Sequence, residues 1–264
     1  MMIKKTYRVI TGALFTVIIF QIGNSHAEGT LSLTSGADYS SGKYGQSKAT
    51  DITYIPFMAK YETDDTIIKL TVPWLEITGP GDVVGGNAPV VLGKSSRPIT
   101  TESGLGDIVL TGTRTIARLG EERPLILDIT GKVKFATASA SKGLGTGKND
   151  YSIALDIYKP INSSATAFGD VGYKVMGDPN GVNLKNVWFG AAGVSYKFNP
   201  VTSAGFMVDT KQATQNTSTS SRELTIFLSH KFNDQYKLQS YITRGFSDAS
   251  PDWGGGAMLA VTFN

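Results

Sequence analysis

Short segments in which apolar and polar residues alternate follow one another along most of the chain. In the segment 125–137, Leu125, Leu127 and Ile129 share one parity, while Asp128 and Lys132 share the other. Alternation with a period of two residues predicts a β-strand with one apolar and one polar face. Similar strands are predicted at 30–40, 50–61, 66–78, 105–119, 151–159, 164–176, 186–198, 201–211, 222–232, 236–246 and 254–264. The parity of strand 105–119 is ambiguous, because Arg114 shares a face with Ile108 and Leu110.

The connections between these segments alternate between short and long. The short ones lie at 62–65, 120–124, 160–163, 199–200 and 233–235. The longer ones, rich in Gly, Ser, Asn and Thr, lie at 41–49, 79–104, 138–149, 177–185, 212–221 and 247–253. Transmembrane barrels have short periplasmic turns and long extracellular loops, whereas a soluble β-sandwich has no reason to sort its loops by length. The pattern therefore predicts an all-β fold, a transmembrane antiparallel up-and-down β-barrel of about 12 strands.

The amino terminus has the features of a Sec-type signal peptide. Lys4, Lys5 and Arg8 precede the apolar run 10–20, and Ser25-His26-Ala27 offers small residues at the −3 and −1 positions of a cleavage site. A membrane-anchoring helix is the alternative, but the run is too short to cross a hydrocarbon layer of about 30 Å. We expect cleavage after Ala27, with residues 1–27 as the signal peptide and residues 28–264 as the barrel. The localisation expected is the outer membrane of a Gram-negative cell.

Composition excludes several other classes of protein. The chain has 25 basic and 22 acidic side chains, and the signal peptide carries three of the basic ones and no acidic one. The mature chain is thus electrically balanced, which is no evidence for nucleic acid as a partner. The absence of cysteine suits an oxidising periplasm. Outer-membrane lipid, lipopolysaccharide, the barrel-assembly machinery and a small solute are the partners expected.

Two segments resemble a known family. The first is Gly104-Leu105-Gly106-Asp107. The second spans the strand ending in Lys132-Val133-Lys134-Phe135-Ala136-Thr137, the loop Gly143-Leu144-Gly145-Thr146-Gly147 and Asp150. Over about residues 103–173 these are similar to the outer-membrane transporter family named for the meta-pathway of phenol degradation, although Ala136-Thr137-Ala138 stands where that family has Pro-Thr-Gly. The resemblance implies a channel-type barrel and does not imply phenol as the solute.

The residues give little support for enzymatic chemistry. His230, the one histidine after residue 27, neighbours Ser229 in a strand, so the two side chains point to opposite faces and cannot form a catalytic pair. His230 is expected at the membrane interface. The segment 143–148 lacks the spacing of a phosphate-binding loop and no helix follows it. We therefore expect no catalytic residue, no metal site and no cofactor.

The polar faces of the strands supply the candidate functional residues. Charges are inexpensive in a wet lumen but would be costly in lipid, so the inward set should line a pore. It comprises Lys69, Asp128, Lys132, Lys134, Asp156, Asp170, Lys174, Glu223 and Lys231. Both signs are present, so simple steering of anions or cations is not predicted. These charges could hold a polar solute in a ladder, or form salt bridges that only stiffen the barrel.

The long connection 79–104 and the lumen together suggest a channel. Val83, Val84, Val90, Val91 and Leu92 are apolar enough to fold into the pore as a constriction, although surface exposure is equally compatible with their sequence. The function expected is an outer-membrane channel for passive or substrate-preferring uptake of small solutes. The alternatives are a closed structural or adhesion-type barrel without transport, an outer-membrane enzyme and a soluble periplasmic β protein.

Overall fold

The chain folds into a closed barrel of antiparallel strands. The computed structural model describes residues 29–86, 89–92 and 98–263, so the expected signal peptide and its expected cleavage site lie outside the described residues. β6 and β7 pair with successive parts of the same strand, β3, and so form one wall of the barrel. Counted this way, the barrel has 12 strands. The walls are β1 (Thr30–Gly42), β2 (Thr50–Glu62), β3 (Thr66–Gly79), β6 (Thr100–Leu105) with β7 (Ile108–Leu119), β8 (Leu125–Phe135), β9 (Asp150–Pro160), β10 (Ala165–Val175), β11 (Val187–Lys197), β12 (Thr202–Lys211), β13 (Ser221–Lys231), β14 (Tyr236–Gly245) and β15 (Trp253–Phe263).

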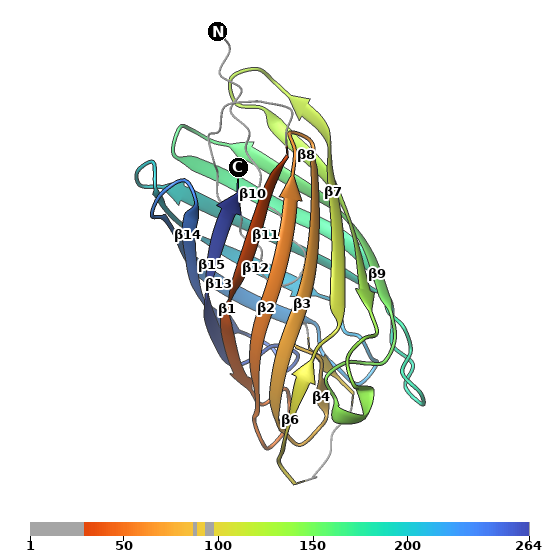
Figure 1. Cartoon of the computed structure of the whole chain (residues 1–264). Helices are drawn as coiled ribbons and strands as arrows, with labels where there is room; N and C mark the ends of the chain where they lie inside the picture. The colour runs from red at the N-terminus through yellow and green to blue at the C-terminus, as the bar shows by residue number, and fades with distance from the viewer. Residues whose placement is uncertain (1–28, 87–88, 93–97, 264) are drawn as a thin grey trace.

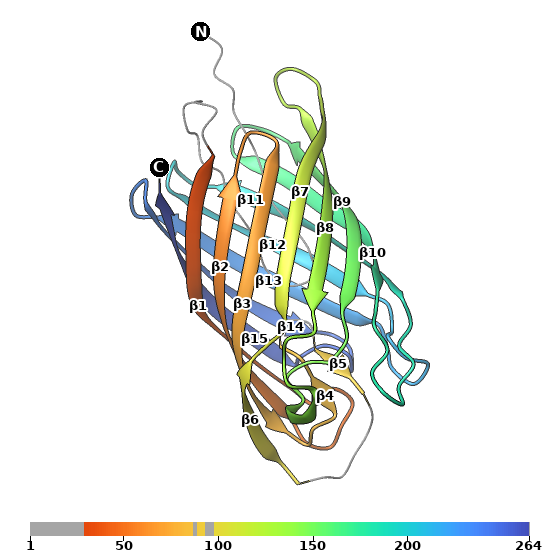
Figure 2. The ribbon, with the colours of Figure 1, turned by 45° about the vertical axis from the view of Figure 1, so that its right-hand side comes forward.

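The barrel closes because its first and last strands pair. β1 and β15 are antiparallel neighbours from Leu31↔Phe263 to Ser41↔Trp253, and every other wall pairs with the next in sequence. β1 begins and β15 ends at the same end of the barrel, the upper end in Figures 1 and 2. We call this the short-turn end and the opposite one the long-loop end. Closure pairs both edges of the spanning walls, which a sheet in hydrocarbon requires, while β6 at the long-loop end pairs with β3 alone.

The predicted strands are all present, and the long connection 79–104 also contains short strands that alternation did not predict. It contains a small hairpin of β4 (Val83–Val84) and β5 (Val90–Val91), followed by β6 on the end of β3. The residues of β6 are mostly polar and lack alternation, because this part of the wall carries no apolar band. Between β6 and β7 the backbone N–H of Gly106 donates to the carbonyl of Pro73, 2.9 Å away. Because the strand is interrupted between Leu105 and Ile108, strict alternation does not identify β6 and β7 as parts of one wall.

The outer surface is apolar over the middle of the barrel. Exposed aliphatic and aromatic side chains cover it, including Phe57, Ile153, Phe206, Ile226 and Ile242. Aromatic side chains are exposed near the strand ends, among them Tyr61, Tyr151, Trp188, Tyr196, Phe198, Phe232 and Tyr236. A band of this kind matches the hydrocarbon layer and its two interfaces.

The ambiguous parity of β7 has a structural cause, a β-bulge between Thr115 and Ala117. Arg114 points outward, but its guanidinium donates to the Thr66 hydroxyl at the short-turn end, 2.6 Å away. Arg118 pairs with Asp65 in the neighbouring turn. The bulge puts Arg118 on the same face as its partner Ile126, which is buried in the lumen, so regular alternation is broken towards the end of this strand. His230 is also placed near the short-turn end, where its Nδ1 lies 2.9 Å from the Thr202 hydroxyl.

The inner surface is polar along some rows and filled by large side chains along others. A buried cluster of Ile126, Tyr158, Phe168, Met207, Phe227 and Tyr241 occupies part of the lumen. Cross-strand hydroxyl pairs, such as Thr113–Thr130 and Thr225–Thr243 at 2.9 Å, satisfy neighbouring inward positions. No helix among the described residues is long and apolar enough to span a membrane.

A lipid-facing position in mid-strand should not tolerate a charge. Ile226 lies at the middle of β13 and is exposed, so Ile226→Arg should lower the free energy of unfolding in lipid vesicles by about 2–4 kcal/mol. The matched control is Phe232→Arg at the short-turn interface, where the cost should be about 0–1 kcal/mol. Denaturant titration followed by tryptophan fluorescence measures both. Equal costs at the two positions would contradict the assignment of the outer face to lipid.

Candidate functional site

A cavity of about 180 Å³ lies inside the barrel, between β2, β3 and β7 on one side and β8 to β12 on the other. Its wall carries five lysines and two aspartates. The lysines are Lys69, Lys132, Lys134, Lys174 and Lys211, and the aspartates are Asp107 and Asp150. The cavity wall therefore has an excess of three positive charges when all these groups are ionised.

Strand register places most of these lysines in one row. Lys69 on β3 is the partner of Thr111 on β7, which is also the partner of Lys132 on β8. Ser152 on β9 is the partner of both Lys132 and Lys174. Paired residues in a sheet present their side chains on the same face, so the three ammonium groups follow one line around the inside of the barrel.

The predicted carboxylates occupy a separate row. Asp156 is the partner of both Asp128 and Asp170, and the neighbouring walls continue this line with Asp209 opposite Glu223. On β8 and β10 each carboxylate stands four residues closer to the short-turn end than the lysine, or about 13 Å along the strand. Asp128 and Asp156 are fully buried, and the Thr130 hydroxyl donates to the Asp156 carboxylate. None of the five acids of this row lines the cavity.

Two of the cavity lysines are neutralised by ion pairs. The Asp150 carboxylate lies 2.8 Å from Lys174 Nζ and 3.3 Å from Lys134 Nζ. Lys134 Nζ also lies 3.1 Å from Asp107 Oδ2 and donates to the Thr146 hydroxyl at 3.0 Å. Asp150 further accepts from the backbone N–H of Gly177. This network joins three strand ends and two long loops at the rim of the cavity.

The segments that carry the family resemblance meet in this network. Asp107 accepts from the backbone N–H of Ala138, and the Thr137 hydroxyl donates to the carbonyl of Gly106. A Cβ at Gly145 would stand 2.7 Å from Asp107 Oδ2, so only glycine allows the loop to approach the carboxylate this closely. Leu144, its neighbour, is buried. The glycine-rich segment is thus a loop that folds onto the lumen wall, and the structure gives it no phosphate-binding helix.

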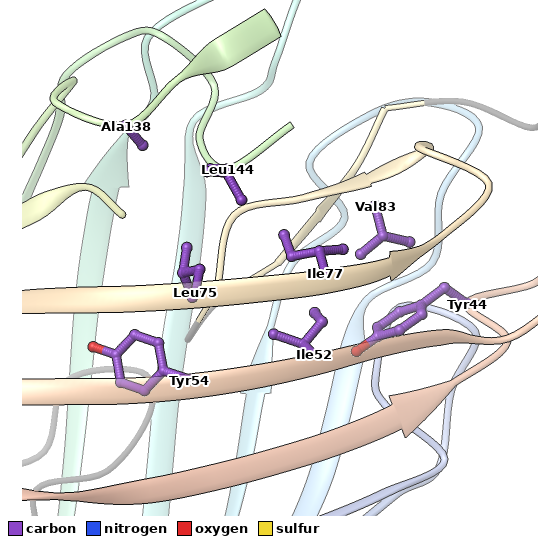
Figure 3. Packing of buried hydrophobic residues seen from close by; sticks show 8 residues of the cluster. All are labelled: Tyr44, Ile52, Tyr54, Leu75, Ile77, Val83, Ala138 and Leu144. Carbon is purple, nitrogen blue, oxygen red and sulfur yellow. The ribbon is translucent and has the colours of Figure 1, made fainter. Parts of the chain in front are cut away.

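The hairpin β4–β5 lies at the long-loop end of the barrel (Figure 2). Val83 packs with Tyr44, Ile52, Ile77 and other side chains that Figure 3 shows projecting from β2, β3 and the loops. Val84 and Val90 pack instead with Met176, Leu184 and Val187 on the side of β10 and β11. Because successive side chains of a strand point to opposite faces, the hairpin contacts both sides of the lumen at once. Val84, Gly85, Gly86 and Val90 contribute directly to the cavity wall.

The nine predicted inward residues therefore have different environments. Lys69, Lys132, Lys134 and Lys174 line the cavity, whereas Asp128, Asp156, Asp170 and Glu223 belong to the carboxylate row. Lys231 is placed at the short-turn end and pairs with Asp234 in the adjacent turn at 2.6 Å. A role for any of them in lining a conducting pore stays a prediction.

Three charged residues of the cavity wall were not in the predicted set. Lys211 has the same parity as Met207 and Asp209 on β12, so alternation could have identified it at the strand end. Asp107 follows the break between β6 and β7, and Asp150 opens β9, so neither stands within a regular alternation. Among the described residues, no group of three or more His, Asp or Glu side chains is arranged to hold a metal ion.

Comparison with known proteins identifies the fold. No family model matches the sequence, and no curated protein matches it. The COG4313 outer membrane channel from Pseudomonas putida F1 has 13% sequence identity and a TM-score of 0.70, and the match covers 91% of this chain and 97% of that one. The KdgM porin has 8% identity and a TM-score of 0.50 over 88% of this chain and 98% of that one. At such low identities the likeness shows the fold alone, a barrel of the kind found in outer-membrane channels.

Loss of the shared carboxylate at the cavity rim should destabilise the barrel. In Asp150→Asn the ammonium groups of Lys134 and Lys174 lose their common counter-charge, so the free energy of unfolding should fall by about 1–3 kcal/mol. The matched control is Asp234→Asn, which breaks an exposed pair with Lys231 and should cause no measurable change. Urea titration of both variants in the same detergent tests this, and an unchanged midpoint for Asp150→Asn would contradict a structural role for the network.

Proposed function

We propose that the protein is an outer-membrane channel that admits small solutes through the lumen of its barrel. The observation that carries this proposal is a charged cavity enclosed by a barrel whose outer surface is apolar. A barrel with a purely structural role has no need for lysines at the centre of its wall, where a filled apolar lumen would be less costly. The fold shared with known outer-membrane channels supports the proposal.

Several finer expectations belong to the same proposal. Residues 1–27 direct export and are removed after Ala27, and the barrel is inserted by the barrel-assembly machinery into a membrane with lipopolysaccharide outside. The short-turn end then faces the periplasm. The convergence of Asp107, Lys134, Gly145 and Asp150 supports kinship with the transporter family named for the meta-pathway of phenol degradation. No catalytic role is proposed.

The hairpin β4–β5 is the natural constriction of such a channel. It lies across the lumen at the end that faces outward, and its valines close the cavity from that side. The Gln215 side chain donates to the carbonyl of Val91 at 2.8 Å, which links the hairpin to a second long loop. Any solute from outside has to pass this hairpin before it reaches the lysines.

Single-channel recording tests the proposal directly. We expect the full chain, expressed in a Gram-negative host and extracted from its outer membrane, to give discrete conductance steps in a planar bilayer. Amino-terminal sequencing of the same sample should begin at Glu28. A folded, heat-modifiable protein without any conductance would overturn the channel and favour the closed structural or adhesion-type barrel.

A looser hairpin should widen the passage. Val84 and Val90 are paired and buried against apolar side chains, so Val84→Ser combined with Val90→Ser should weaken their packing and raise the single-channel conductance or the open time. The control is Ile99→Ser, since Ile99 is exposed and outside both clusters. Identical traces for wild type and the double variant would mean that the hairpin does not control the passage.

A further inference from the structure

We propose that the lumen has a second constriction, an apolar one on the short-turn side of the cavity, and that Phe168 and Phe227 set its width. The inference rests on the proposed function and deepens it, since it names residues that limit the size of a solute leaving the cavity. The observation behind it is the buried cluster in the lumen, which we call the inner cluster and which comprises Ile126, Tyr158, Phe168, Met207, Phe227 and Tyr241.

The inner cluster borders the cavity on its short-turn side. Tyr241 belongs to the cluster and Met258 packs against it, and both side chains line the cavity. On β8 and β10 the cluster members stand six residues closer to the short-turn end than the cavity lysines, or about 20 Å along the strand. The buried carboxylates of Asp128 and Asp156 lie between these two levels.

In the part of the chain that the structure describes, the inner cluster and its contacts reach nine of the twelve walls. Its members come from β8, β9, β10, β12, β13 and β14, while Ala191 on β11 and Met258 on β15 pack against them. The Tyr241 hydroxyl donates to the Asp38 carboxylate on β1. On the remaining side, the inward-facing Ile67 at the short-turn end of β3 is also buried. A solute that moves from the cavity towards the short-turn end therefore has to pass the inner cluster.

Two rings of the cluster converge over the strands that separate them. Phe168 stands on β10 and Phe227 on β13, three strand spacings apart, which is about 14 Å along the sheet. Their ring centroids are nevertheless only 6.4 Å apart. Both side chains therefore extend over β11 and β12 towards each other, and they are 5% and 1% exposed.

Glycines beneath the two rings determine how far the rings reach into the lumen. Gly193 on β11 is the partner of Phe168, and a Cβ there would stand 2.6 Å from the ring atom Cζ. Gly205 on β12 is the partner of Phe227, and a Cβ there would stand 2.4 Å from its Cζ. Each ring therefore lies directly on the backbone of the next strand. Since both glycines are inward positions, a side chain at either one would push the ring away from the wall and narrow the lumen.

An apolar constriction acts on a solute through its size and its hydration. Hydrophobic constrictions in channels exclude water and ions until they widen. The rings of Phe168 and Phe227 offer no hydrogen bond that could replace the water lost by a passing ion. The two rings therefore limit both the ionic conductance and the largest uncharged solute that passes.

Single-channel recording of two variants tests this role. Phe168→Ala and Phe227→Ala should each raise the conductance by about twofold or more, because each removes a ring from the constriction. The matched control is Phe206→Ala, the same change at an outward position of β12 that is 49% exposed, which should leave the conductance unchanged. Heat-modifiable migration on a gel confirms that each variant has folded. Wild-type conductance in both lumen variants would overturn the proposal.

A glycine variant tests the same constriction in the opposite direction and removes no side chain. Gly205→Ala should lower the conductance by about twofold or more, because its methyl group displaces the Phe227 ring towards the lumen axis. The matched control is Gly131→Ala on β8, where a Cβ has no neighbour within 4 Å. An unchanged or higher conductance in Gly205→Ala would contradict the role of the ring.

Swelling of liposomes that contain the protein tests the limit on size. With arabinose and sucrose as probes, the combined variant Phe168→Ala with Phe227→Ala should raise the rate for sucrose, relative to arabinose, by about twofold or more. An unchanged ratio would overturn the size limit.

The same recordings separate failure of this inference from failure of the channel. Conductance in the wild type with no change in any lumen variant would uphold the channel and reject the constriction. Conductance in the phenylalanine variants alone would uphold the constriction and reject an open wild-type channel. Silence of the wild type and of every variant would reject both.

Discussion

The requirement that every backbone N–H and C=O be hydrogen-bonded in hydrocarbon determines this structure. A closed sheet meets it, and the pairing of β1 with β15 completes the closure. In a closed barrel, successive side chains of each spanning strand therefore face lipid and the lumen in turn. All the chemistry available to the chain is therefore confined to the inner parity of the strands and to the loops that fold inward.

This confinement explains why the long loops pack so closely on the wall. The Gly143–Gly147 segment approaches Asp107 where no side chain could fit, and Lys134 joins it to Asp150. The hairpin β4–β5 depends on the same packing, since Gly85 donates from its backbone N–H to the carbonyl of Gly143 at 3.1 Å. The motif that looks like a ligand-binding loop in the sequence is thus the support on which the constriction rests.

The sequence was sufficient to predict the fold, because parity and loop length follow directly from closure. Every wall was predicted within a few residues, and the nine charged residues proposed for the lumen all lie on inner faces or at their ends. Parity could not predict how far along the barrel axis each side chain lies, because that position depends on the stagger between strands. Lys132 and Lys231 follow the same rule of alternation, yet one lines the cavity and the other is bound to Asp234 in a turn. The hairpin was missed for a related reason, since its four strand residues are too few to show a period.

The stagger between strands also determines where the charged side chains of the lumen lie relative to one another. The composition is balanced, and the sequence predicted no preference for either sign of charge. Register instead places Lys69, Lys132 and Lys174 in one row and Asp128, Asp156 and Asp170 in another, about 13 Å closer to the short-turn end on β8 and β10. Coulomb interactions strengthen where water is excluded from the lumen. A solute in the lumen therefore experiences the local row of charges and not the sum over the chain.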